Sequence, residues 1–179
     1  MSEHQPVEVA IRLSTVGQLF NPFDRSPFRE RDISAGVEEF LVGWVRELPP
    51  TTPFVIAVYL PVEELAKPQA QHIAEAIGHY FRDRTQVATR DLRELFHIGR
   101  RSLAIGVLVL VACLASSQLA ATLLPHGVLA RVLEESLIIV GWVANWRPIE
   151  IWLYDWLPIR RRIRLNRRIA AARVEVKAG

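Results

Sequence analysis

The chain has 179 residues, of which 50% are apolar and 23% charged, and its formal net charge is +3. Residues 1–99 hold 14 acids and 10 bases, whereas residues 155–179 hold 2 acids and 8 bases. The pI of 9.5 therefore reflects the C-terminal segment, and the acidic N-terminal part is not expected to bind nucleic acid. The single cysteine, Cys113, excludes an intrachain disulfide and a cysteine-based metal cluster. Residues 1–30 lack the apolar run of a signal peptide.

Four elements are expected before the first long apolar segment. Val7–Leu13 alternates like a short strand, and Phe54–Leu60 has the apolar character of a buried strand. A helix with an apolar stripe lies between them and ends at Leu48, and a second helix runs from Pro68 into the apolar segment. This order predicts an α+β cytoplasmic domain over residues 1–97, with a small two-stranded parallel sheet in a predominantly helical chain. Because two strands are marginal alone, we expect a second copy or another protein to cover the sheet.

A hairpin of two transmembrane helices is expected over residues 98–147. Its first span, residues 103–124, has 22 positions without a charge, enough to cross a hydrocarbon core of about 30 Å. A proline-glycine turn leads to the second span, residues 128–146, which contains one arginine and two glutamates. Arginines precede the first span and follow the second, so we expect a multi-pass protein with both termini in the cytoplasm.

Residues 148–179 are expected to form an interfacial helix followed by a basic cytoplasmic tail. Four of the five tryptophans cluster around the end of the second span, which is the aromatic-belt position. The arginines that follow are expected to contact anionic lipid headgroups. The residues predicted at the headgroups are Arg147, Trp152, Trp156, Arg160, Arg161, Arg162, Arg164, Arg167 and Arg168.

The expected spans contain four polar side chains of interest, Gln118, Glu134, Glu135 and Asn145. Ionisable groups inside a span are functional candidates. We favour a second interpretation, in which both glutamates lie at the membrane rim and pair with Arg131. Packing of the two helices is expected to use a small-residue face formed by Ala112, Ser116 and Ala120.

One helical face carries a candidate metal site. His72, Glu75, His79 and Asp83 follow each other at spacings of three, four and four residues. No second cluster of ligands completes such a site, so we favour a solvated face with weak side-chain pairs. No cofactor is expected.

The segment GWVANWRPIEIWLYDWLPIRRR, together with LFNPFDRSPFRERDIS near the start, resembles a group of small uncharacterised bacterial inner-membrane proteins that carry a WRPxEIxLYDWxPIRR-like segment. The resemblance implies a location in the bacterial inner (cytoplasmic) membrane. It implies no activity and transfers no functional residue.

Three functions from different classes are compatible with these features. The leading expectation is a non-enzymatic, membrane-anchored accessory, scaffold or assembly protein that forms a homo-oligomer or binds a membrane-protein partner. The alternative is a small oligomeric transport or channel element that uses the polar residues of the spans. The second alternative is a membrane-bound, metal-dependent enzyme centred on the histidine-containing helical face.

Overall fold

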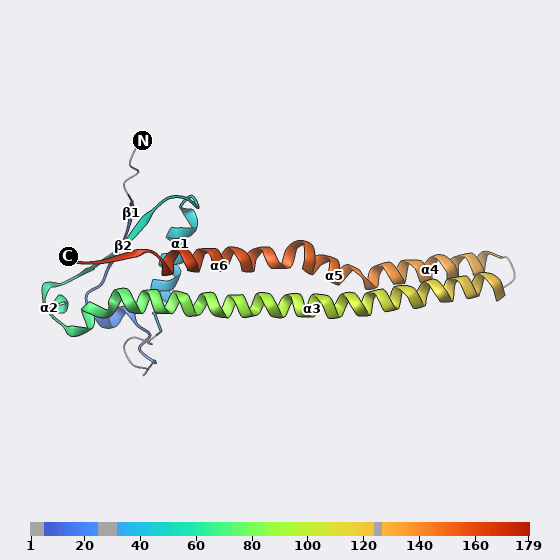
Figure 1. Cartoon of the computed structure of the whole chain (residues 1–179), viewed down its shortest axis with the longest axis horizontal. Coiled ribbons are helices and arrows are strands. Elements are labelled where there is room, and N and C mark those ends of the chain that lie inside the picture. Colours follow the sequence, from blue (N-terminus) through green and yellow to red (C-terminus); the bar gives the residue numbers. More distant parts are fainter. Residues whose placement is uncertain (1–5, 25–31, 124–126) are drawn as a thin grey trace. The chain divides into compact units, whose positions relative to one another are not determined.

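The computed structural model describes residues 6–24, 32–123 and 127–179, apart from the side chains of residues 129 and 130. Two compact units make up the chain: unit 1 is Met1–Ala88 with Arg161–Gly179, and unit 2 is Thr89–Arg160. The elements are β1 (Val7–Arg12), the 3-10 helix η1 (Val16–Leu19), α1 (Ala35–Glu47), β2 (Phe54–Leu60), α2 (Val62–Leu65), the 3-10 helix η2 (Pro68–His72), α3 (Ile73–Leu123), α4 (Val128–Ala144), α5 (Trp146–Glu150), the π-helical segment η3 (Ile151–Asp155), α6 (Trp156–Ala170) and β3 (Arg173–Ala178) (Figure 1).

The sheet of unit 1 has three parallel strands in the order β1-β2-β3. The parallel pairing of β1 with β2 is as expected, but the prediction of a two-stranded sheet is wrong. The third strand comes from Arg173–Ala178, at the end of the segment predicted to be a basic tail. Val174 and Val176 alternate with charged residues, as in a strand covered on one face, and both pack against the core. The high positive charge of the segment had concealed this period.

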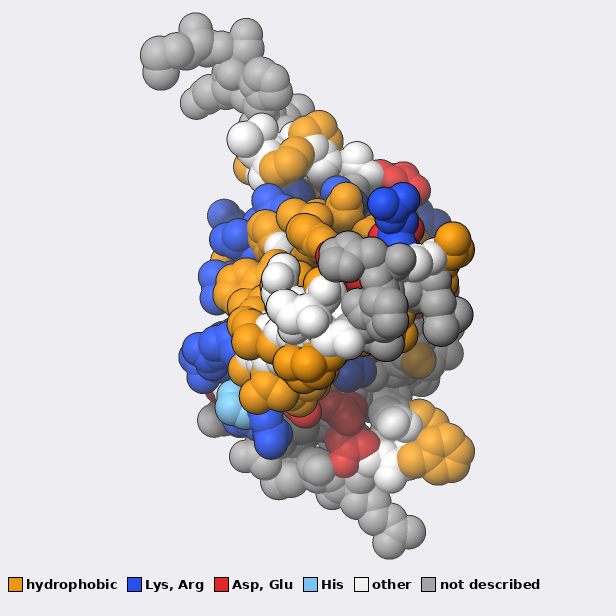
Figure 2. Space-filling model, turned by 90° about the vertical axis from the view of Figure 1, so that its right-hand side faces the viewer, with side chains coloured by type: hydrophobic (Ala, Val, Ile, Leu, Met, Phe, Trp, Pro, Cys, Tyr) orange, Lys and Arg blue, Asp and Glu red, His pale blue; other side chains and the backbone are white. Residues whose placement is uncertain are grey.

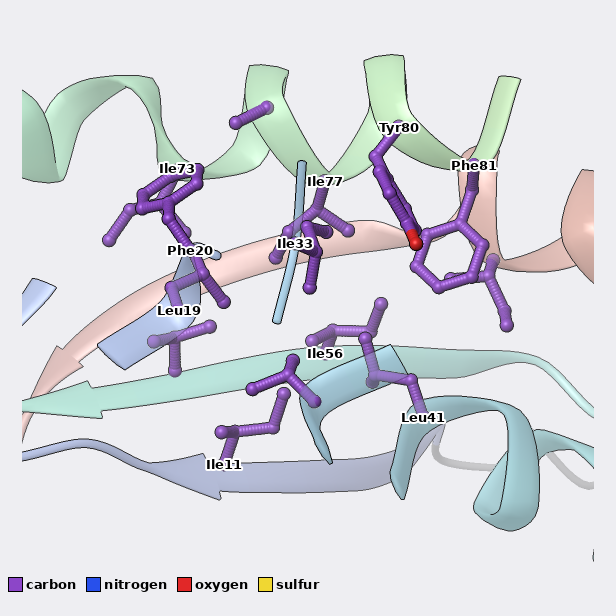
Figure 3. Close-up of a cluster of buried hydrophobic side chains, with 14 of the residues drawn as sticks. Ile11, Leu19, Phe20, Ile33, Leu41, Ile56, Ile73, Ile77, Tyr80 and Phe81 are labelled. Atoms are coloured by element: carbon purple, nitrogen blue, oxygen red, sulfur yellow. The ribbon is translucent and has the colours of Figure 1, made fainter. Parts of the chain in front are cut away.

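The core of unit 1 lies between one face of the sheet and the helices that cover it (Figure 3). Ile73, Ile77 and Phe81 project from α3 at helical spacing and are fully buried. They meet Leu41 of α1 and Ile56 of β2, which are also fully buried. The apolar stripes that predicted α1 and the start of α3 therefore form the centre of the domain.

Helix α6 completes unit 1. Ile163, Asn166 and Ile169 are buried at a three-residue spacing, so one face of this helix is in the interior. A Cβ atom built on Gly78 of α3 would lie 3.7 Å from the carbonyl oxygen of Ala170, which places α3 and α6 side by side within unit 1 (Figure 1). Unit 1 therefore contains residues from both ends of the sequence, unlike the expected division at residues 97 and 147.

Among the described residues, one helix is long and apolar enough to cross a membrane, and it comprises η2 and α3 (Pro68–Leu123). Helix α4 has 17 residues and contains Arg131, Glu134 and Glu135, which leave its uncharged stretch short. The prediction of a two-span transmembrane hairpin is therefore wrong, and with it the multi-pass topology loses its support. The prediction that helix runs without interruption from Pro68 through the apolar segment is confirmed.

Candidate membrane-binding surface

Two polar side chains and several glycines are buried in unit 2, together with the apolar Ile151. Asn145 is 7% exposed, and its Nδ2 donates to the carbonyl oxygens of Gly106 at 3.1 Å and Gly141 at 2.9 Å. A Cβ atom on Gly106 would lie 2.7 Å from Asn145 Oδ1. Ser117 of α3 is 2% exposed. The amide of Asn145 therefore ties α3 to the end of α4, at a position where α3 has to be a glycine.

A second close approach lies between α3 and η3. A Cβ atom on Gly99 would lie 2.9 Å from Cγ2 of Ile151, which is fully buried, and the rings of Phe96 and Trp152 are 5.4 Å apart. The π-helical turn ends at Asp155, three residues before Pro158, whose ring lacks an N–H and would crowd the carbonyl of Tyr154 in a regular α-helix. The wider turn lets the helix continue into α6.

Many hydrophobic side chains of unit 2 are exposed, and hydrophobic side chains gather on the end of the molecule seen in Figure 2. Ile105 is 64% exposed and Leu108 is 70% exposed, although both lie in the apolar segment of α3. Only 17% of the apolar window of α3 is buried. An apolar surface of this extent indicates contact with lipid or with another protein. The other exposed members are Leu103, Val107, Val111, Leu114, Leu119, Leu123, Val128, Val132, Leu133, Ile139, Val140, Trp142 and Val143.

The aromatic residues of α5 and η3 are also exposed. Trp146 is 68% exposed, and Trp152 and Tyr154 project outward as well. In contrast, Arg147 has two partners within the protein: its Nη1 lies 3.0 Å from Glu150 and 3.2 Å from Asp155. The guanidinium of Arg147, which was predicted to contact headgroups, is therefore paired with these two carboxylates.

The arginines of α6 fall into two groups. Arg168 donates to the carbonyl oxygens of Pro49 at 3.0 Å and Thr52 at 3.2 Å, and its guanidinium lies 5.5 Å from the ring centre of Phe54. It therefore holds the turn between α1 and β2. The other group is exposed, and no acidic side chain of the described residues forms an ion pair with it. Its members, here called the free arginines of α6, are Arg160, Arg161, Arg162, Arg164 and Arg167.

The other polar residues predicted inside the spans lie in different surroundings. Gln118 and Glu135 are exposed, whereas Glu134 is half-buried. The predicted ion pair between Arg131 and these glutamates is not present among the described side chains. Asn145 is the one that forms a packing contact between helices. Of the small-residue face predicted at Ala112, Ser116 and Ala120, the first two are exposed and Ala120 is half-buried. The packed face of α3 is instead formed by Gly106, Leu110, Cys113 and Ser117.

The candidate metal site does not assemble. His72 Nδ1 lies 3.5 Å from Glu75, and His79 Nδ1 lies 3.1 Å from Asp83, so each histidine has its own acidic neighbour. Among the described residues, no three histidine, cysteine or acidic side chains come together in a way that could hold a metal ion. The side-chain pairs favoured from the sequence are the observed arrangement.

A network across the open face of the sheet was missed by sequence reasoning. Glu8 of β1 accepts a hydrogen bond from the Tyr59 hydroxyl at 2.7 Å and one from Lys177 Nζ at 3.0 Å. The hydroxyl, and then the lysine, lower the pKa of Glu8, while the carboxylate raises the pKa of Tyr59. The three residues belong to β1, β2 and β3, so the network ties all three strands together. Their separation in the sequence hides it.

Two further networks connect helices of unit 1. The Tyr80 hydroxyl of α3 donates to Glu38 of α1 at 2.6 Å, and Arg84 donates to the same carboxylate at 3.0 Å. Glu64 of α2 accepts hydrogen bonds from Lys67 and from the backbone N–H of Val16, and both lower its pKa. These charged groups hold elements of the fold together.

Comparison of the chain with protein-family models, with curated proteins and with solved structures gives no match. The resemblance to small bacterial inner-membrane proteins therefore stays an expectation.

Proposed function

We propose that this chain is a non-enzymatic, membrane-anchored accessory or scaffold protein of the bacterial inner membrane. In this proposal α3 inserts into the bilayer, and unit 1 is a binding domain attached to it. The observation that carries the proposal is the packing of unit 2, which has Asn145 and Ser117 inside and apolar side chains outside.

Such an arrangement suits lipid better than water. In lipid, helix association is driven by close packing of small residues and by interhelical hydrogen bonds, since apolar burial supplies no driving force. The Gly106–Asn145 contact has both features. In water, Ile105 and Leu108 would gain little of the transfer free energy that burial of an apolar side chain provides, because most of their surface stays exposed.

Unit 1 has features of a binding domain. Phe40 and Trp44 of α1 are 41% and 44% exposed, and their ring centres lie 6.4 Å apart on adjacent turns. Phe23 is 92% exposed on a turn held by a hydrogen bond from its own N–H to Asn21 Oδ1. Exposed aromatic side chains on ordered backbone are frequent anchors of protein–protein contacts. The charged networks of this unit have structural partners, which supports a role without catalysis.

Fractionation of a bacterial host tests the membrane attachment. The chain is expected in the inner-membrane fraction after an alkaline carbonate wash. Leu108→Arg should reduce this retention, because an arginine at the centre of a membrane helix costs about 3 kcal/mol. The control, Arg46→Leu, changes an exposed residue of α1 and should not alter it. Release of the unaltered chain by carbonate would contradict the proposal.

Cross-linking in membranes tests the scaffold role. The unaltered chain is expected to form one defined cross-linked complex, which Phe40→Ser with Trp44→Ser abolishes while Arg46→Ser preserves it. Retention of the complex by the double variant would show that α1 is not the binding face. Absence of any complex from the unaltered chain would remove the scaffold role.

A further inference from the structure

We propose that the free arginines of α6 bind the anionic phosphate headgroups of a lipid surface. The proposal rests on the membrane attachment proposed above and assigns a lipid partner to the exposed arginines of one helix. Four of the five arginines, Arg161, Arg162, Arg164 and Arg167, belong to the folded α/β unit, and not to a flexible tail.

The first argument is the geometry of α6. Ile163, Asn166 and Ile169 place one face of the helix in the interior of unit 1. At 100° per residue, Arg161 and Arg164 lie on the opposite side of the helix. Because the buried face fixes the rotation of α6, the Cα–Cβ bonds of both arginines point away from the interior before any ligand binds. Such preorganisation reduces the entropic cost of binding.

The second argument is charge. Five exposed arginines occur among the eight residues 160–167, and residues 156–172 contain no aspartate or glutamate. None of the five forms an ion pair with a described acidic side chain. In contrast, Arg168 donates hydrogen bonds to the carbonyl oxygens of Pro49 and Thr52. Neighbouring cations without counter-charges repel each other, and a phosphate layer removes this repulsion. The planar guanidinium also matches a phosphate with two parallel hydrogen bonds.

The third argument selects a lipid surface over a nucleic acid. Three exposed aromatic side chains, Trp146, Trp152 and Tyr154, precede the arginines in the sequence, and such residues concentrate at the membrane interface. The guanidinium of Arg160 lies 5.1 Å from the ring centre of Trp156, so the two kinds of side chain meet. The N-terminal part of the chain is acidic, with 14 acids and 10 bases over residues 1–99, which disfavours a polynucleotide.

The test uses the full chain inserted into vesicles and labelled with phenylglyoxal, which modifies accessible arginines. Peptide mass spectrometry then gives the labelling of each arginine in neutral vesicles and in vesicles with about one third anionic phosphatidylglycerol. The free arginines should be protected at least about fivefold by the anionic lipid, which corresponds to the usual attraction of one basic residue to such a surface. Salt at about 1 M should remove most of this protection. Exposed Arg46 of α1 and engaged Arg168 should label equally in both vesicles.

A set of variants separates the arginine face from net charge. Arg161→Gln, Arg164→Gln and Arg167→Gln together should abolish the protection of Arg160 and Arg162. The matched triple variant Arg12→Gln, Arg46→Gln and Arg82→Gln loses the same charge from other elements of unit 1 and should keep it. Thermal unfolding of each variant shows that the substitutions, all at exposed positions, leave the fold intact.

The outcomes are distinguishable. Equal labelling in neutral and anionic vesicles, with the chain firmly inserted in both, would overturn the headgroup site and leave the membrane attachment standing. Failure of the chain to insert would overturn the proposed function itself. Stronger protection by added RNA on neutral vesicles than by anionic lipid would assign the face to a nucleic acid and refute the proposal.

Discussion

Unit 1 and unit 2 bury different kinds of side chain. The fully buried large residues of unit 1 are aliphatic or aromatic, such as Leu41, Ile77 and Phe81, and ion pairs such as that of Glu8 with Lys177 lie on its outside. In unit 2 the buried groups include Asn145 and Ser117, while valines, leucines and tryptophans are exposed.

The difference supports the membrane attachment proposed above. The hydrophobic effect puts apolar residues inside when the surroundings are water. It gives no such preference when the surroundings are lipid, where close packing and hydrogen bonds hold helices together. Under the proposed function, one chain combines a domain that buries its apolar side chains with a helical unit whose exposed apolar side chains contact lipid. The two are continuous through α3 and α6, which contribute residues to both.

The largest effect is expected from removing Arg161–Gly179. This deletion takes away β3 and the buried residues Ile163 and Ile169 from unit 1. The remaining chain, residues 1–160, should therefore lack a cooperative unfolding transition of unit 1 and should be cleaved rapidly by protease within residues 1–88. Circular dichroism during heating checks this. A cooperatively folded fragment would show that the C-terminal segment is not part of the domain.

Replacing an isoleucine by alanine should reduce the stability strongly in unit 1 and very little in unit 2. Ile77→Ala in unit 1 empties a fully buried position and should cost about 2–5 kcal/mol of stability. Ile105→Ala in unit 2 removes a side chain that is 64% exposed and should change the stability by less than about 0.5 kcal/mol. Denaturant titration of both variants in mild detergent measures the difference. Equal effects would remove the contrast between the units.

Local sequence patterns predicted the parts of the fold in which one face is apolar. Phe54–Leu60 was identified with its observed bounds, and α1 lies within the predicted helix. The alternation of apolar and charged residues in β3 is visible in the sequence. Because three of its six residues are charged, the composition instead indicates a basic tail. A strand of this kind can be recognised only when the adjacent strand is known to lack a hydrogen-bonding partner.

The contacts inside unit 2 were harder to predict, for a physical reason. The segment of α3 that packs against α4 is apolar on every side, so no period marks the contacting face. Small residues occur at Ala112 and Ser116 and also at Gly106 and Ser117. Gly106 and Ser117 are the ones that are buried in the structure. Asn145 was recognised as polar within an apolar stretch, but only the fold reveals that its partners are the carbonyls of Gly106 and Gly141.

A smaller effect is expected at the close approach inside unit 2. Gly106→Ala places a methyl group against Asn145 Oδ1 and the carbonyl oxygen of Ala144, and should cost about 1–3 kcal/mol. The control is Gly141→Ala, where the nearest atom is the mobile Cδ1 of Leu110, so the cost should stay near 1 kcal/mol. Unfolding of the two variants by dodecyl sulfate measures the difference. If Gly106→Ala is the milder change, the Asn145 contact does not hold α3 against α4.

The smallest expected effect is a pH dependence confined to unit 1. The pKa values of Glu8 and Glu64 are lowered from 4.5, so their ionised forms stabilise the fold above that pH. This stabilisation is lost as the pH falls below 4.5 and both groups take up protons. Glu8→Gln with Glu64→Gln should therefore flatten the acid side of the melting-temperature profile. The control Glu47→Gln, at an exposed carboxylate, should leave the profile unchanged, and an equal flattening by it would contradict the assignment.

The contrast between the two units is tested most directly by joining the two parts of unit 1 without unit 2. Gly78 and Ala170 are neighbours, and Ala88 and Arg161 lie about 15 Å and 14 Å along their helices from this contact. The two ends are therefore close, and a linker of about six glycine and serine residues can replace Thr89–Arg160. The joined protein should remain in solution without detergent and unfold in one cooperative transition, whereas the full chain should enter the detergent phase. A joined protein that requires detergent or fails to fold would contradict the division into a water-adapted domain and a lipid-adapted helical unit.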